Sequence, residues 1–61
     1  MNINTASAAE LQTLSGIGPS MAQSIIDERT QNGAFASVDD LMRVSGIGEK
    51  KLVKIKDCIC V

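Results

Sequence analysis

The sequence of 61 residues contains no histidine, tryptophan or tyrosine, and Phe35 is its single aromatic side chain. Without histidine, the chain lacks the commonest general base and metal ligand. One aromatic ring makes no platform on which single-stranded bases stack, and it favours neither a sandwich nor a barrel. We therefore expect no enzyme, and no single-strand binder that works by stacking.

The chain is also poor in cysteine and in long apolar runs. Its two cysteines, Cys58 and Cys60, are too few for a disulfide framework or a zinc site, so we interpret them as packing or incidental thiols. No apolar run approaches the roughly 18 to 20 residues of a membrane span. The sequence also does not open with a charged segment followed by an apolar one, as a signal peptide does. We expect neither a span nor a targeting signal in these residues.

Neither charge sign is in excess. Six basic and seven acidic residues give a net charge of −1, which excludes a strongly cationic nucleic-acid binder at the level of the whole chain. Charge can still be concentrated on one face. With 44% hydrophobic and 21% charged residues, the composition is that of a globular protein, and the length allows one small domain.

The most informative feature is an internal repeat. A shift of thirty positions places residues 7–30 on 37–60 with eight identities among 24 pairs, five of them in the octets LQTLSGIG and LMRVSGIG. Copies this short cannot each enclose a core, so we expect them to pack on each other as a pseudo-symmetric pair.

Each copy has the same helix boundaries. Ser7 and Ser37 begin helices as N-caps, each with an acid three residues later as in a capping box. A turn then follows, with special backbone angles at both glycines and the isoleucine between them as an apolar plug. It leads to a second helix, which Pro19 opens in the first copy. Asn32-Gly33 ends that helix. The sequence predicts an all-α fold of four to five short helices, the fifth being a short turn at the bridge: hairpin one at about 7–32, the bridge at 33–36, and hairpin two at about 37–60.

A Gly-Ile-Gly turn before a helix leaves backbone N–H groups unpaired at the positive end of the helix dipole, where a phosphate oxygen fits. Such amides contact a nucleic-acid backbone without reading its bases. One such turn is commonly only a connection, but two copies followed by lysines favour a two-point grip on phosphates. The predicted donors are the amides of Gly16, Gly18, Ser20, Met21, Gly46, Gly48, Lys50 and Lys51, with charge from Lys50, Lys51 and Lys54.

Two segments resemble the helix-hairpin-helix motif of non-sequence-specific DNA-binding proteins: LSGIGPSMAQSI and VSGIGEKKLVKI. Together with NINTASAAEL, NGAFASVDDL and GIGEKKLVKIKD, they resemble the C-terminal domain of ComEA-type competence proteins. The resemblance implies a tandem helix-hairpin-helix domain that binds double-stranded DNA during natural transformation, with other DNA-uptake proteins as further partners. It also implies an extracytoplasmic location, at the cell surface or in the periplasm, with a membrane anchor outside this domain.

The resemblance implies no organic cofactor, but family hairpins often hold a monovalent cation such as K⁺ or Na⁺ through turn carbonyls. Carried over, these are the carbonyls of Gln12, Leu14, Ile17, Met42, Val44 and Ile47. The chain departs from the family pattern at Pro19-Ser20-Met21, where relatives often have a basic residue. The first hairpin is therefore expected to rely on its amides and the Ser20 hydroxyl alone, and to grip more weakly than the second.

Three alternatives remain open at this point. The domain is a protein-interaction or oligomerisation module that kept the fold and lost most DNA contact, or it is the DNA-positioning part of a repair enzyme. A magnesium-dependent nuclease built on Glu10, Asp27-Glu28 and Asp39-Asp40 is the least favoured. Those acids are better explained by helix dipoles and by a solvated face.

Overall fold

The computed structural model describes all residues from Met1 to Val61 and consists of two helical hairpins. Hairpin one contains α1 (Ala8–Leu11) and α2 (Pro19–Gln31). Hairpin two contains the 3₁₀ helix η1 (Val38–Arg43) and α3 (Glu49–Ile55), followed by a short 3₁₀ turn η2 (Lys56–Cys58). No helix is long and apolar enough to cross a membrane. The predicted all-α tandem fold is confirmed, although the fifth helical segment follows α3 and does not lie at the bridge.

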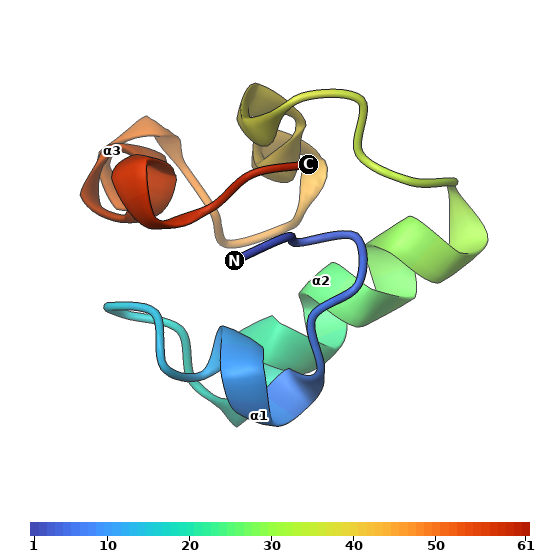
Figure 1. Cartoon of the computed structure of the whole chain (residues 1–61), viewed down its shortest axis with the longest axis horizontal. Helices are drawn as coiled ribbons and strands as arrows, with labels where there is room; N and C mark the ends of the chain where they lie inside the picture. Colours follow the sequence, from blue (N-terminus) through green and yellow to red (C-terminus); the bar gives the residue numbers. More distant parts are fainter.

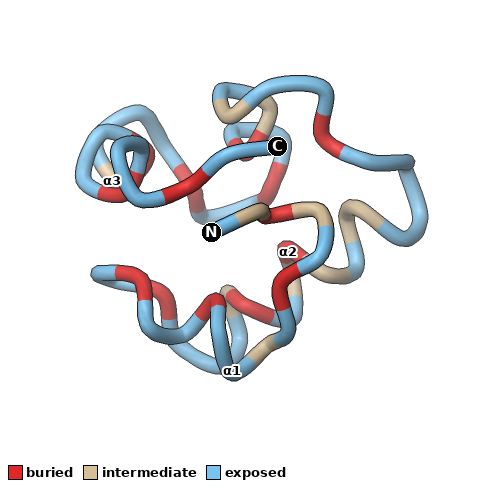
Figure 2. The backbone as a smooth tube through the Cα atoms, in the orientation of Figure 1, coloured by how far each residue is buried: buried red, intermediate tan, exposed pale blue.

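The core repeats with the sequence. Five pairs of residues thirty positions apart are buried in both copies: Leu11 and Leu41, Leu14 and Val44, Ile17 and Ile47, Ala22 and Leu52, Ile25 and Ile55. All buried residues are apolar, so the hairpins share one apolar core. Figure 2 shows these buried positions in both halves of the molecule. The two copies therefore pack on each other, as the repeat predicts.

The N-terminal segment completes this core. It runs between the two hairpins (Figure 1), and Ile3 is fully buried. The Ile3 N–H donates to the Cys60 carbonyl at 2.9 Å, and Asn2 forms a parallel β-bridge with Cys60. Arg29 Nη1 donates to the Ile3 carbonyl at 2.8 Å. The two terminal segments of the chain are thereby tied together, and Arg29 ties them to α2.

The bridge between the hairpins is anchored by Phe35, which is 2% exposed. Its N–H donates to Asn4 Oδ1 at 2.8 Å, and Asn4 Nδ2 donates to its carbonyl at 3.0 Å. The Arg43 guanidinium lies over the ring at 4.8 Å from the centroid, and Arg43 Nε pairs with Glu28 Oε2 at 3.3 Å. Two basic residues, Arg29 and Arg43, are thus committed to holding the fold.

The helix starts confirm one predicted cap and correct the other. Ser7 forms a complete capping box, in which its Oγ accepts from the Glu10 N–H and its own N–H donates to Glu10 Oε1. Ser37 is the N-cap of η1, but its side chain makes no capping hydrogen bond. Instead Asp40 Oδ2 accepts from the Ala36 N–H at 3.0 Å. Because the carboxylate reaches one residue further back, the predicted capping box at Ser37 is wrong.

Candidate nucleic-acid interface

Each turn between helices is closed by the same hydrogen bond. The Ile17 N–H donates to the Leu14 carbonyl, and the Ile47 N–H donates to the Val44 carbonyl, both at 3.1 Å. The turns therefore span residues 14–17 and 44–47. The third residue of each is a glycine with positive φ, 79° at Gly16 and 96° at Gly46. This pattern is that of a type II turn, in which that position requires glycine. The isoleucines plug the core, as the sequence predicts.

The second glycine of each turn behaves differently from the prediction. Gly18 has φ −95° and ψ −175°, and Gly48 has φ −98° and ψ −179°, which is extended backbone open to any residue. No heavy atom lies within 4 Å of the position that a Cβ would take at either glycine. The expectation of special backbone angles at both glycines is therefore wrong for the second. Nothing inside the protein requires glycine at positions 18 and 48.

The predicted amide donors are unpaired within the chain. In the second helix of each hairpin, the fourth residue is the first to donate a helical backbone hydrogen bond. The Ala22 N–H donates to the Gly18 carbonyl, and the Leu52 N–H donates to the Gly48 carbonyl. Earlier amides have no intrahelical partner. The unpaired donors are the amides of Gly16, Gly18, Ser20, Met21, Gly46, Gly48, Lys50 and Lys51. The two helix ends that carry these amides also have no side-chain cap.

The structure adds one donor that the sequence reasoning missed. The Glu49 amide is also unpaired, whereas Pro19 at the equivalent position has no N–H. Comparing the two copies in the sequence could have revealed this extra donor, because proline is the one residue without an amide hydrogen. Hairpin two therefore presents one more amide than hairpin one.

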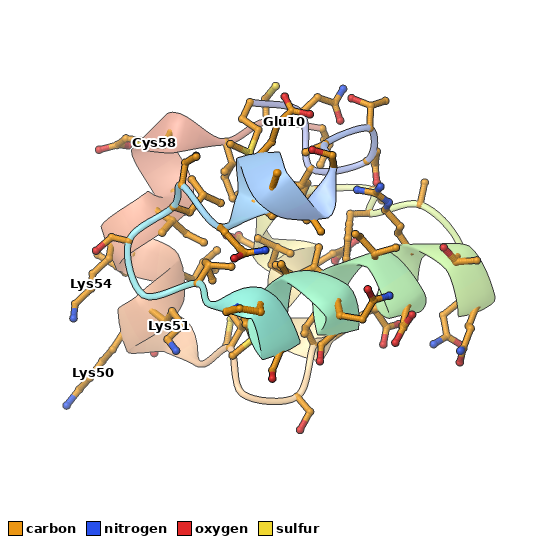
Figure 3. All side chains as sticks on the ribbon, turned by 90° about the horizontal axis from the view of Figure 1, so that it is seen from below. Glu10, Lys50, Lys51, Lys54 and Cys58 are labelled. Atoms are coloured by element: carbon orange, nitrogen blue, oxygen red, sulfur yellow. The ribbon has the colours of Figure 1, made fainter.

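The free basic side chains all lie on α3. Lys56 Nζ pairs with Asp39 Oδ1 at 3.3 Å, and both arginines are held by the fold. Lys50, Lys51 and Lys54 make no ion pair. Figure 3 shows Lys50 and Lys54 pointing away from α3 into solvent. A chain of net charge −1 thus concentrates its uncommitted positive charge on one helix beside the turns.

The acidic side chains do not gather. No group of three or more cysteine, aspartate or glutamate side chains is placed to hold a metal ion. Glu10 belongs to the Ser7 capping box, and the Ser7 backbone N–H, followed by its hydroxyl, lowers the pKa of Glu10 below 4.5. Cys58 and Cys60 are free and exposed, so they are not packing residues. The acidic residues of the nuclease alternative are therefore not assembled into a metal-binding group.

Sequence comparisons agree with this geometry. The family model described as "Helix-hairpin-helix motif" matches residues 1–60. The chain is 54% identical over all 61 residues to ComE operon protein 1 of Bacillus subtilis, of which it spans 30%. It is 48% identical over 61 residues to endonuclease/exonuclease/phosphatase family domain-containing protein 1 of Homo sapiens, of which it spans 11%.

A third relative is an uncharacterized protein of Haemophilus influenzae, which is 43% identical over 60 residues, or 97% of this chain and 54% of that protein. The chain thus spans less than a third of the length of the first two relatives. Its own match to the family model is nearly complete. The repeat, the paired turns and these matches agree, and the chain belongs to the helix-hairpin-helix family.

Proposed function

We propose that this domain binds double-stranded DNA without sequence preference, by holding phosphates of the backbone at its two turns. The observation that supports this most strongly is the pair of unpaired amide sets, each beside a glycine that the fold itself does not require. A phosphate oxygen satisfies such amides. A missing Cβ at positions 18 and 48 lets a bulky backbone approach closely.

Backbone amides explain why the binding needs neither aromatic rings nor base-reading side chains. Phosphate contacts position a protein on the duplex and carry no direct sequence information. Three lysines without an ion pair add positive charge, and three is a small number for a DNA-binding surface. We therefore expect weak, salt-sensitive binding by the isolated domain, at roughly 10⁻⁴ to 10⁻⁶ M.

The test is a fluorescence anisotropy titration of two labelled duplexes of unrelated sequence at several salt concentrations. Equal affinities that fall steeply with salt support the proposal. No binding at low salt, or a strong preference for one duplex, contradicts it. The double variant Lys50→Glu, Lys51→Glu is expected to abolish binding, while Asp57→Asn, an exposed charge change of the opposite sign, should not weaken it.

We further propose that the domain serves DNA uptake in competence, in a longer protein that places it outside the cytoplasmic membrane. The 54% identity to ComE operon protein 1 supports this role. The 48% identity to a protein named for an endonuclease/exonuclease/phosphatase domain favours a second candidate, a DNA-positioning module of a larger enzyme. The reading frame on either side of the domain distinguishes the two, since only the second requires an adjoining catalytic domain.

A protein-interaction module is the remaining alternative, and exposed apolar side chains favour it. Val53 on α3 is 66% exposed and Met42 on η1 is 49% exposed. The Lys50→Glu, Lys51→Glu variant separates this alternative from DNA binding, because loss of these charges need not weaken an apolar contact. A wild-type domain that binds no DNA, and that binds another protein equally well before and after this double change, would support the alternative.

We also propose that a monovalent cation fits the turn carbonyls. The Leu14 and Val44 carbonyls each accept one amide, which leaves each a lone pair for a second partner. With the carbonyls of Gln12, Ile17, Met42 and Ile47 they form two sets of neutral oxygen donors. DNA affinity in potassium chloride should exceed that in tetramethylammonium chloride at equal concentration. Equal affinity in the two salts would contradict a cation site.

A further inference from the structure

Two side chains cross from one hairpin to the turn of the other. Met21 and Lys51 occupy the same position in the two copies, thirty residues apart. Lys51 Cε lies 3.6 Å from the position that a Cβ on Gly16 would take. Met21 Cε lies 2.8 Å from the corresponding position on Gly46. The second helix of each hairpin therefore contributes one long side chain that covers the first glycine in the turn of the other hairpin.

This exchange depends on the glycines. Gly16 and Gly46 already have positive φ, and without a side chain each leaves room for a long neighbour. Both Met21 and Lys51 are half-buried. A lysine can bury its methylene stem as methionine does and keep its ammonium in water. The stem of Lys51 thus takes the place in one half of the molecule that Met21 takes in the other.

The Lys51 ammonium is left beside the first turn. The nitrogen lies one C–N bond, roughly 1.5 Å, beyond Cε, and it makes no ion pair. Figure 3 shows Lys51 on the side of α3 nearer the start of α2, while Lys50 and Lys54 point into solvent. A positive charge encoded in hairpin two is therefore located at hairpin one.

We infer that Lys51 supplies the positive charge of the phosphate site at the first hairpin, while Lys50 serves the second. This inference rests on the proposed function, because it assigns charges within the same two sites. It differs from the expectation that hairpin one relies on its amides and the Ser20 hydroxyl alone. The backbone amide of Lys51 remains at the second hairpin, so one residue joins both sites.

The acidic residues reinforce this distribution. The first turn of α2 contains no acid, whereas Glu49 stands in the first turn of α3. The second hairpin therefore presents Lys50 beside an opposing carboxylate, and the first presents Lys51 with none. The two hairpins should bind phosphate with similar strength, although all three free lysines belong to α3.

The test uses inorganic phosphate as the probe, and one amide in each hairpin reports the Kd at that hairpin. Amide chemical shifts of Gly18 and Gly48 are followed through titrations at constant ionic strength. Removing one charge about 4 Å from a phosphate in water should weaken binding about threefold to fivefold. Lys51→Met should raise the Kd at Gly18 by this factor and leave the Kd at Gly48 unchanged.

Lys50→Met is the matched control, and it should raise the Kd at Gly48 alone. The gain-of-charge variant Met21→Lys should lower the Kd at Gly48, because residue 21 covers the second turn. The inference is overturned if Lys51→Met weakens phosphate binding at Gly48, or at both hairpins equally. It is also overturned if neither turn responds to phosphate. The proposed function fails separately, if the wild-type domain binds no duplex in the anisotropy titration.

Discussion

Adding one methyl group to the second glycine of each turn is expected to separate DNA binding from folding. Gly18 and Gly48 have extended backbone angles, and the position of a Cβ at either is in open space. Alanine there loses less conformational freedom than glycine on folding, a gain of roughly 0.4–1 kcal/mol. Alanine is the poorer N-cap by a similar amount. The free energy of unfolding should therefore change by less than about 1 kcal/mol.

The effect on DNA binding should be much larger. In the proposed binding mode, the new Cβ of Gly18→Ala or Gly48→Ala occupies the open space through which a phosphate reaches the amides. A hydrogen bond to a charged group is worth about 1.5–3 kcal/mol. Loss of one such contact should weaken binding roughly tenfold to a hundredfold. Anisotropy titration at low salt, where binding is tightest, measures this loss, and denaturant unfolding measures stability.

Gly33→Ala is the control, a variant expected to lose stability and to keep DNA binding. Gly33 lies after α2, away from both turns, with φ 89° and open space at the Cβ position. A side chain in this left-handed region costs roughly 1–2 kcal/mol of stability, while the folded variant should bind DNA normally. The reasoning is refuted if folded Gly18→Ala and Gly48→Ala bind DNA like the wild type. It is also refuted if they lose as much stability as Gly33→Ala.

Three further predictions concern the fold. The Ser7 capping box lowers the pKa of Glu10, so the stability that it contributes is present above pH 4.5 and is lost as pH falls through the lowered pKa. Wild type and Glu10→Gln should therefore differ in denaturant midpoint at neutral pH and converge in acid. A difference that stays constant with pH would contradict this. Phe35→Ala should cost about 3–5 kcal/mol, which is most of the stability of so small a domain, and a Tm close to wild type would contradict it. Asn4→Ala unpairs the buried N–H and carbonyl of Phe35 and should cost about 2 kcal/mol by denaturant unfolding; a loss under 0.5 kcal/mol would show that water replaces both bonds.

Local chemistry allowed much of this fold to be predicted from the sequence. The start of α2 follows from Pro19, its end from Asn32-Gly33, and the burial of Ile17 and Ile47 from their place between two glycines. Each of these signals acts within a few residues of the structure it specifies. The repeat then predicted that the two halves share a core, because neither can bury its apolar face alone.

The remaining features depend on contacts between distant residues. Ile3 is buried through pairing with the other end of the chain, which no local pattern reveals. The missing cap at Ser37 follows from a carboxylate that reaches Ala36 instead. At the site, the amide donors follow from helix ends, but the crossing of Lys51 to Gly16 requires knowing how the hairpins face each other.

The two-point grip on the phosphate backbone is tested without any variant by an amide chemical-shift map of the wild-type domain, titrated with two short duplexes of unrelated sequence. Both duplexes should shift the same amides, in residues 16–21 and 46–51. Gly33 and the C-terminal half of α2 should change little. Shifts confined to other surfaces, or a map that changes with DNA sequence, would contradict a two-point grip on the phosphate backbone.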